Sequence, residues 1–206
     1  MTSPPHGTTY VPERQSEYWA SRKIEDFFWD LGYECLSFPI SPRIEKLIPA
    51  DFIFVPSHTI KIFGLQYKAL YRGAVDYWDL DAMQHQQMKS LPWIYYALSE
   101  MRTARDFRAA LHALRFPDPA PSPGKVYINS FAGRGYLRWW AFYERLRDCH
   151  LGHRVHDEAD FINAFVPVWD SPIVTRELDN MADVFLFNTT ARRLVRFSTM
   201  LSPLIQ

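Results

Sequence analysis

The stretch PADFIFVPSHTIKIFGLQYKALYR, residues 49–72, constrains the fold of this chain more than any other. It predicts two apolar strands separated by a turn at Pro56–His58. Both strands have the composition of a protein core, yet they carry Asp51, Gln66 and Lys68. Burying such groups without partners costs several kcal/mol, on the order of the stability of a small domain. These three side chains therefore need a shared role.

The pattern on either side of this stretch predicts an α/β fold. Residues 12–32 have helical spacing, with an apolar stripe through Ile24, Phe28 and Leu31 and Gly32 as the C-cap. Further strands are predicted at 33–40 and 92–99, and helices at 76–91 and 104–116. The order helix, three strands, helix, strand predicts an α/β sandwich with a mixed sheet whose first three strands form a meander.

The chain divides at a proline-rich segment. We expect a flexible N-terminus at 1–11, a core at 12–116, a loop at 117–124 and an α+β extension at 125–206 that packs on the core. Within the extension, the pattern predicts a strand at 125–130, a helix around 136–150 and a hairpin at 183–197 that turns at Asn188–Thr189.

Composition excludes several classes of protein. Hydrophobic residues make up 48% of the 206, and the formal net charge is zero, so a nucleic-acid role cannot rest on overall charge. Two cysteines are too few for a disulfide framework. The start of the chain has no signal-peptide pattern, and no apolar run reaches about 18 residues, so we expect a cytoplasmic protein without a membrane span.

Strand alternation predicts a cation site. Gln66 and Lys68 lie on the same face of their strand, and Asp51 lies opposite Gln66 if the two strands pair. The Asp51 carboxylate, the Gln66 side-chain oxygen and the main-chain carbonyl of Tyr67 are oxygen ligands suited to Mg²⁺ or Mn²⁺. Lys68 would serve the attacking water and stabilise negative charge. The alternative is that Asp51 caps a turn and Lys68 reaches solvent from a sheet edge.

The segments SEYWASRKIEDFFWDLGYECLSFP, ADFIFV and FGLQYKALYR together resemble the restriction-endonuclease-like nucleases, the PD-(D/E)xK superfamily. PAD, residues 49–51, stands where the family has PD, with one alanine inserted. QYK, residues 66–68, resembles the QxK variant of Mrr-type restriction enzymes. The resemblance implies a glutamate on the first helix that faces the metal, and Glu17 and Glu25 are the candidates, with Glu17 favoured.

The resemblance also implies a function. It implies a Mg²⁺- or Mn²⁺-dependent endo- or exodeoxyribonuclease in prokaryotic restriction, anti-phage defence or DNA repair, which acts as a homodimer or with an ATPase or helicase subunit. The rival is a degenerate nuclease-fold subunit that binds a partner protein or nucleic acid; the glutamine at position 66 and the zero net charge favour it.

Several other polar groups are candidates for contacts with DNA. Arg72 follows the third strand, and the next helix carries Gln84, Gln87 and Lys89, which could contact phosphates or form a solvated face. A basic and aromatic set in the extension could track a nucleic-acid strand, or its rings could be core. That set comprises Arg134, Arg138, Trp139, Trp140, Arg192, Arg193, Arg196 and Phe197.

Two weaker patterns have ordinary alternatives. Cys149, His150, His153 and His156, with Asp157 as a further ligand, could hold zinc or be a solvated helix end. The acidic run with Asp76, Asp79 and Asp81 could supply a second metal ligand, but such runs more often cap the next helix.

Overall fold

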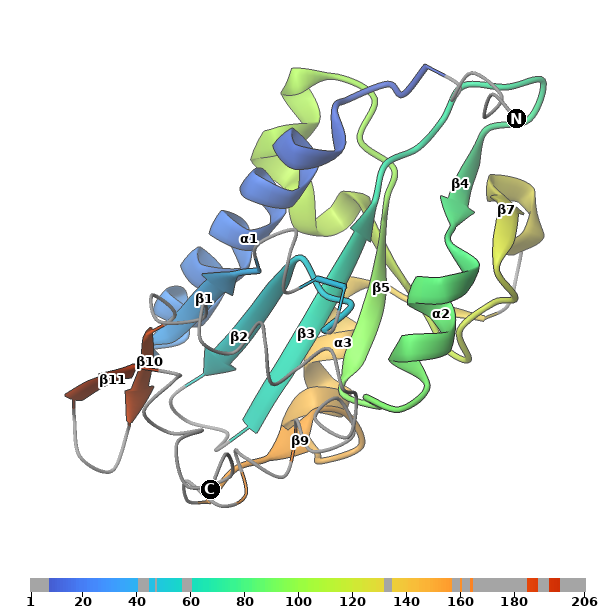
Figure 1. Ribbon diagram of the computed structural model, residues 1–206. Helices are drawn as coiled ribbons and strands as arrows, with labels where there is room; N and C mark the ends of the chain where they lie inside the picture. The colour runs from blue at the N-terminus through green and yellow to red at the C-terminus, as the bar shows by residue number, and fades with distance from the viewer. Residues whose placement is uncertain are drawn as a thin grey trace.

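The computed structural model has a mixed β-sheet with helices on both faces (Figure 1). The structure describes residues 8–40, 45–46, 48–56, 61–131, 135–156, 160, 164, 185–188 and 193–196. Side chains are described in all of these ranges except the last two.

The central sheet has the strand order β1-β2-β3-β5-β6-β8, and β9 pairs with the start of β3. The first three strands form the antiparallel meander expected from the sequence, and β5 runs parallel to β3. The protein is therefore of the mixed α/β class. These strands are β1 (Cys35–Pro39), β2 (Phe52–Pro56), β3 (Lys61–Lys68), β5 (Ile94–Ser99), β6 (Leu114–Pro117), β8 (Tyr136–Leu137) and β9 (His153–Arg154).

Two hydrophobic cores cover the two faces of this sheet. One packs α1 (Glu13–Asp30), the 3-10 turns η1 (Ala104–Ala113) and α3 (Trp139–Arg147) against alternate residues of β3. The other packs α2 (Ala82–Met88) and the ribbon of β4 (Tyr77–Leu80) and β7 (Gly124–Tyr127) against the opposite face. Because both faces are covered, all eight residues of β3 are buried, which explains its almost continuous apolar sequence.

Helix α1 follows the predicted stripe closely. Ile24 and Phe28 are fully buried, and Gly32 has φ +81°, a left-handed conformation that glycine adopts without strain. The N–H of Tyr33 donates to the Phe28 carbonyl at 2.9 Å, which ends the helix. Leu31 is 38% exposed, so the apolar stripe ends one turn earlier than predicted.

The predicted helices at 76–91 and 104–116 are wrong in part. Residues 77–80 form β4, which buries Trp78 and Leu80 in alternation and pairs with β7, and only the second half of the segment is helical. In 104–116 the chain forms 3-10 turns with a kink at Ala109 and then strand β6. Pairing with β7 overrides the local helical spacing in the first segment, and pairing with β5 and β8 makes residues 114–117 of the second a strand.

The N-terminal segment contacts the fold, and two segments after the proline-rich loop form strands. Residue Thr9 bridges to Tyr71 and Val11 is buried, so the described part of the expected flexible N-terminus contacts the fold. The segment predicted as a strand at 125–130 forms β7 and the short 3-10 turn η2 (Ile128–Phe131). The predicted hairpin is confirmed as β10 (Phe185–Asn188) paired with β11 (Arg193–Arg196).

Two of the expected turns lie partly outside the described residues. Residues 57–58 of the expected β2–β3 turn and residue 189 of the hairpin turn lie outside the described residues. Within the described part of the chain, no helix is both long and apolar enough to cross a membrane.

Candidate functional site

Asp51 and Gln66 lie opposite each other at the end of the β2–β3 ladder. The register pairs Phe52 with Leu65, and one step further along it brings Asp51 beside Gln66. The Gln66 Nε2 donates to Asp51 Oδ2 at 2.9 Å, and the main-chain N–H of Tyr67 donates to the same oxygen at 2.6 Å. One carboxylate oxygen therefore accepts two hydrogen bonds, which fixes the carboxylate at the strand end.

The ladder is irregular at this point, and the irregularity concerns the Tyr67 carbonyl. A regular antiparallel ladder would pair Ala50 with Tyr67. The Ala50 N–H donates instead to the Ile48 carbonyl at 2.7 Å, and the Asp51 N–H donates to the Leu65 carbonyl at 2.9 Å. The Tyr67 carbonyl therefore does not receive the ladder hydrogen bond from Ala50. The side chain of Tyr67 points to the other face of the sheet, where its hydroxyl contacts Ser21 Oγ at 3.1 Å.

Gln66 leaves an oxygen unused. Its side chain is fully buried, and its Oε1 has no hydrogen-bond partner among the described residues. No described residue donates a hydrogen bond to Asp51 Oδ1 either. A buried acceptor without a partner costs about 1–3 kcal/mol. Gln66 Oε1 thus needs a donor or a cation, and Asp51 Oδ1 beside it receives no hydrogen bond from the described residues.

Carboxylates from outside the strands surround this pair. Burial, with Glu17 as the next cause, raises the pKa of Asp51 to about 8. Burial also raises the pKa of Glu17 to about 7, and the neighbouring Glu13 and Glu45 add to the rise. Carboxyl groups from the start of α1 and from the β1–β2 loop therefore gather beside the end of β3. A bound proton or cation would relieve the repulsion.

Lys68 is the cation of this cluster. Its side chain is 11% exposed, and its Nζ lies 4.0 Å from Glu13 Oε1. Glu13 is itself held by the main-chain N–H of Ala69, which donates to its Oε2 at 3.2 Å. The positive charge of Lys68 lowers the pKa values of Glu17 and Asp51, although burial outweighs this effect. We call Glu13, Glu17, Glu45, Asp51, Gln66 and Lys68 the carboxylate cluster.

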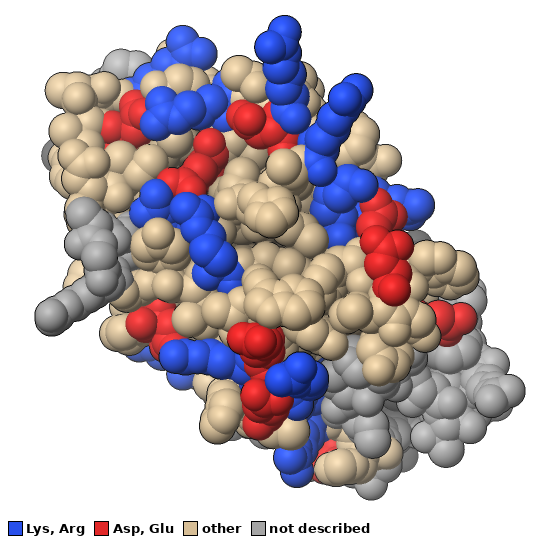
Figure 2. Space-filling model, turned by 180° about the vertical axis from the view of Figure 1, so that it is seen from behind, with Lys and Arg blue, Asp and Glu red and all other residues tan. Residues whose placement is uncertain are grey.

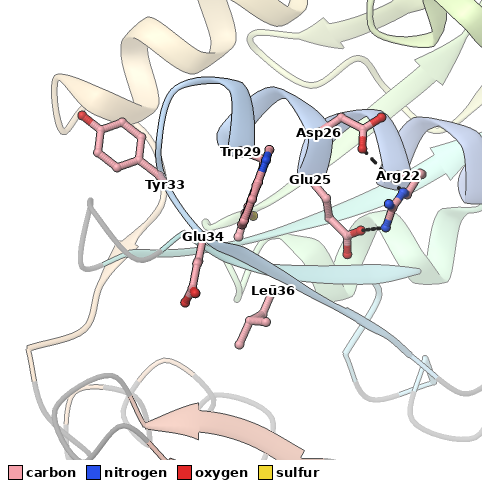
Figure 3. A pocket seen from close by; sticks show the side chains of 8 residues that line it. Arg22, Glu25, Asp26, Trp29, Tyr33, Glu34 and Leu36 are labelled. Carbon is pink, nitrogen blue, oxygen red and sulfur yellow. Dashed lines mark hydrogen bonds and ion pairs between the residues drawn. The ribbon is translucent and has the colours of Figure 1, made fainter.

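The structure does not bring Glu25 to the carboxylate cluster. Glu25 lies eight residues after Glu17, about 12 Å further along the helix. Its carboxylate accepts a hydrogen bond from Ser37 Oγ and pairs with Arg22 at 3.3 Å. It lines a separate groove of about 640 Å³ with Trp29 and other residues between α1 and β1 (Figure 3). Of the two sequence candidates, only Glu17 lies beside Asp51.

The donor set fits a hard cation with few protein ligands. In the described part of the chain, no three His, Cys, Asp or Glu side chains are close enough together to hold one ion. Asp51 supplies one carboxylate, and Gln66 Oε1 and the Tyr67 carbonyl supply neutral oxygens. Mg²⁺ commonly binds through one or two carboxylates and keeps several waters, so this oxygen-only set suits Mg²⁺ or Mn²⁺.

The amides of α2 hold a loop. The Gln84 Nε2 donates to Glu45 Oε1 at 2.8 Å, and the Gln87 Nε2 donates to the Lys46 carbonyl at 2.6 Å. These contacts place Glu45 in the carboxylate cluster; the sequence left phosphate contacts and a solvated face open for these amides. Lys89 is the exposed C-cap of the helix.

Of the basic and aromatic set in the extension, the structure describes the side chains of Arg138, Trp139 and Trp140. Arg138 pairs with Glu100 at 2.6 Å, and Trp139 is buried, so these two belong to the fold; Trp140 is 54% exposed. Figure 2 shows Lys and Arg intermixed with Asp and Glu on the face that it presents, in keeping with the zero net charge. Arg134, Arg192 and Phe197, and the side chains of Arg193 and Arg196, lie outside the described part.

Cys149, His150, His153 and His156 form no metal-binding group among the described residues, and Asp157 lies outside them.

The acidic run serves the fold. Asp81 caps α2 by accepting from the N–H groups of Met83 and Gln84 at 2.8 and 2.9 Å. Asp76 pairs with Arg102 at 2.7 Å, and Asp79 is exposed on β4.

Sequence reasoning missed Glu13 and Glu45. Glu13 precedes Glu17 by four residues, so the helical period alone could have placed both on one face. Glu45 lies in a loop, and nothing in the local pattern indicates that α2 would hold it beside Asp51.

Comparison of the chain with protein-family models, curated proteins and solved structures finds no match in any of the three. The function must therefore be argued from the chemistry of the carboxylate cluster.

Proposed function

We propose that the protein is a metal-dependent deoxyribonuclease of the restriction-endonuclease-like class. One observation carries the proposal: Asp51 and Gln66 meet at a strand end with an unpartnered buried oxygen, and Lys68 follows two residues later on the same strand. The order of α1, the β1–β2–β3 meander, α2 and the parallel β5 agrees with the core that the PD-(D/E)xK resemblance implies. This agreement supports the proposal independently of the site.

Asp51, Gln66 Oε1 and the Tyr67 carbonyl would hold Mg²⁺ or Mn²⁺. When bound, such a cation supplies Lewis-acid stabilisation of the phosphate and acidifies water. The irregular ladder at Ala50 and the double hydrogen bond to Asp51 Oδ2 orient these oxygens before any ligand arrives. Preorganisation of this kind avoids a reorganisation cost during the reaction.

Lys68 and Glu17 would perform the proton and charge chemistry. The Lys68 ammonium, held near Glu13, is a fixed positive charge for the phosphoryl oxygens, which become more negative during in-line attack by water. Glu17, with a pKa raised to about 7 by burial and its acidic neighbours, has the proton affinity of an effective general base near neutral pH. It would accept the proton of the attacking water.

A cleavage assay tests the proposal. Linear and circular DNA are incubated with Mn²⁺ and with wild type, Lys68→Ala or Asp51→Ala. We expect cleavage by wild type only, with a loss of about 100-fold or more in each variant, the size expected for removal of one charge-stabilising group. Lys23→Ala, which removes a half-buried lysine of α1 paired with Asp26, is the matched control and should cleave normally. Equal cleavage by wild type and Lys68→Ala would refute the assignment.

A non-catalytic nuclease-fold subunit is the second candidate. Two features favour it. Position 66 carries an amide, and the described residues hold no group of three ionisable side chains that could bind a metal. Thermal unfolding with added Mn²⁺ separates the candidates. The nuclease predicts stabilisation that disappears in Asp51→Ala, whereas the binding subunit predicts no shift in either protein. A homodimer or an ATPase or helicase partner is compatible with both.

A further inference from the structure

Beyond Lys68 the chain enters a surface lined by tyrosines. The rings of Tyr71 and Tyr77 stack with centroids 5.5 Å apart, and the ring of Tyr127 lies 6.1 Å from that of Tyr77. Tyr10 lies beside them, because its N–H donates to the Leu70 carbonyl at 3.1 Å. We call these four residues the tyrosine surface.

Three cations lie against these rings. The guanidinium carbons of Arg72 and Arg102 are 4.5 and 4.6 Å from the centroid of Tyr10, and Lys125 Nζ is 4.6 Å from that of Tyr77. Arg102 is paired with Asp76. Arg72 and Lys125 are exposed and form no ion pair among the described residues. Neither charge is therefore consumed by a close ion pair, although Asp79 stands opposite Lys125 in the ribbon register.

The tyrosine surface is rigid, and three of its four side chains are half-buried. The β4–β7 ribbon buries Trp78 and Val126 on its inner side, which places Tyr77, Asp79, Lys125 and Tyr127 on its outer side. Reciprocal main-chain hydrogen bonds of 2.8 and 3.2 Å join Tyr71 to Tyr77. Tyr127 is 44% exposed. The side chains therefore need little ordering on binding, which favours affinity.

The tyrosine surface is continuous with the carboxylate cluster. Tyr71 follows Lys68 by three residues, and Glu13 of the cluster, after burial, raises the pKa of the Tyr71 hydroxyl. A strand that lay along the tyrosine surface would thus lead towards Asp51 and Lys68.

We propose that the tyrosine surface with Arg72 and Lys125 binds an unpaired DNA strand and leads it to the carboxylate cluster. This inference rests on the proposed nuclease function and names its substrate class. Aromatic side chains stack with bases only where the base faces are free, which is the case in a single strand. A duplex hides those faces and could use only the two cations, which are too few to hold it.

Binding is measured by fluorescence anisotropy in EDTA, where cleavage cannot occur, with a labelled single-stranded oligonucleotide and its duplex. We expect wild type to bind the single strand at least about tenfold tighter than the duplex, since each stacked base contributes about 1–3 kcal/mol. Tyr127→Ala should weaken single-strand binding about tenfold, and Tyr127→Phe should restore it. The slope of log K against log salt is negative, and Lys125→Ala should make it shallower by about 0.7.

Tyr18→Ala is the matched control, because Tyr18 is a 61% exposed tyrosine on α1 outside the tyrosine surface. It should bind like wild type. Far-UV circular dichroism confirms that each variant is folded. Equal affinity for duplex and single strand, an unchanged affinity in Tyr127→Ala, or no binding of DNA would overturn the inference. If the protein fails this binding test but cleaves DNA with Mn²⁺, the inference is wrong and the proposed function stands. If it binds as expected but does not cleave, the binding assignment stands and the proposed function is wrong.

Discussion

At the scale of single residues, the site depends on the environment of one carboxylate. Asp51 is mostly buried, receives two hydrogen bonds on one oxygen and faces further carboxylates. Burial and repulsion favour its protonated form, while hydrogen bonds and Lys68 favour the charged form. Because burial dominates, the folded protein without a cation holds a proton here that the unfolded chain releases.

This difference predicts a pH-dependent stability. Asp51 and Glu17 have folded pKa values of about 8 and about 7, above their ordinary values of 3.8 and 4.5. Between about pH 4 and 8 the folded state binds more protons than the unfolded state, so the free energy of unfolding falls as pH rises. The slope is at most about 1.4 kcal/mol per pH unit for each group.

Urea unfolding at pH 5, 6, 7 and 8 in EDTA measures this slope. Asp51→Asn, which cannot ionise at this position, should flatten the slope. In wild type, Mn²⁺ in place of EDTA should restore stability at pH 8, because the cation replaces the proton. Stability that rises from pH 5 to 8 in the metal-free wild type would contradict the environment described for Asp51.

The two glutamates of α1 give a matched pair of variants. Glu17→Gln removes a carboxylate beside Asp51, and we expect cleavage to fall about 100-fold, the lower range for a lost general base. Glu25→Gln changes a residue that contacts Arg22 and Ser37, so cleavage should stay within about twofold. Initial rates on the same DNA with Mn²⁺ distinguish them. Loss of cleavage in Glu25→Gln, with normal cleavage in Glu17→Gln, would show that Glu25 and not Glu17 completes the site.

Residue-level prediction from the sequence succeeded where strand geometry decides position. The two-residue period places Gln66 and Lys68 on one face, and antiparallel pairing places Asp51 opposite Gln66. It failed for Glu45, because a loop residue reaches the carboxylate cluster only through a hydrogen bond from Gln84, 39 residues further along the chain. No local pattern encodes such a contact.

At the scale of elements, tertiary pairing decided what local spacing could not. Residues 76–91 have an apolar spacing that also suits a helix, yet Trp78 and Leu80 alternate inward in a strand because β7 pairs with them from the other side of the proline-rich loop. The meander was predictable, since prolines bound its strands and each strand is short and apolar. Elements whose partners are adjacent in sequence are the ones that the sequence reveals.

The close approach of β2, β3 and β5 gives a prediction at this scale. A Cβ at Gly64 would lie 3.0 Å from Ile94 Cγ1 and 3.2 Å from Ala50 Cβ. Gly64→Ala should therefore destabilise the protein by about 1–3 kcal/mol through overpacking, and the shift of Ala50 should reach Asp51. Urea unfolding measures the loss. Gly32→Asn, at a left-handed position with open space, is the control and should cost only a few tenths of a kcal/mol. An unchanged unfolding midpoint in Gly64→Ala would contradict the packing.

At the scale of the whole molecule, residues on both sides of the proline-rich loop build one structure. The sequence suggests a division at 117–124, but β8 extends the central sheet beside β6, β9 pairs with β3, and β7 completes the ribbon with β4. Helix α3 covers the same face as α1, and the ring of its Phe142 stacks on Phe116 at 4.3 Å. Composition marks the loop clearly, but it carries no information about what packs across it.

A chain that ends at Pro117 should therefore fail to fold. It would lose the four large side chains that α3 buries, and burial of each contributes about 1.5–3 kcal/mol, or about 6–12 kcal/mol together. That loss is comparable with the whole stability of a typical domain, about 5–15 kcal/mol. A chain that ends at Ala164 keeps these contacts and the hydrogen bond from Trp93 Nε1 to the Ala164 carbonyl, so it is the control. Circular dichroism during urea unfolding compares the two: we expect a cooperative transition only in the longer chain. A cooperative transition in the shorter one would show that residues 12–116 fold without the segment that follows.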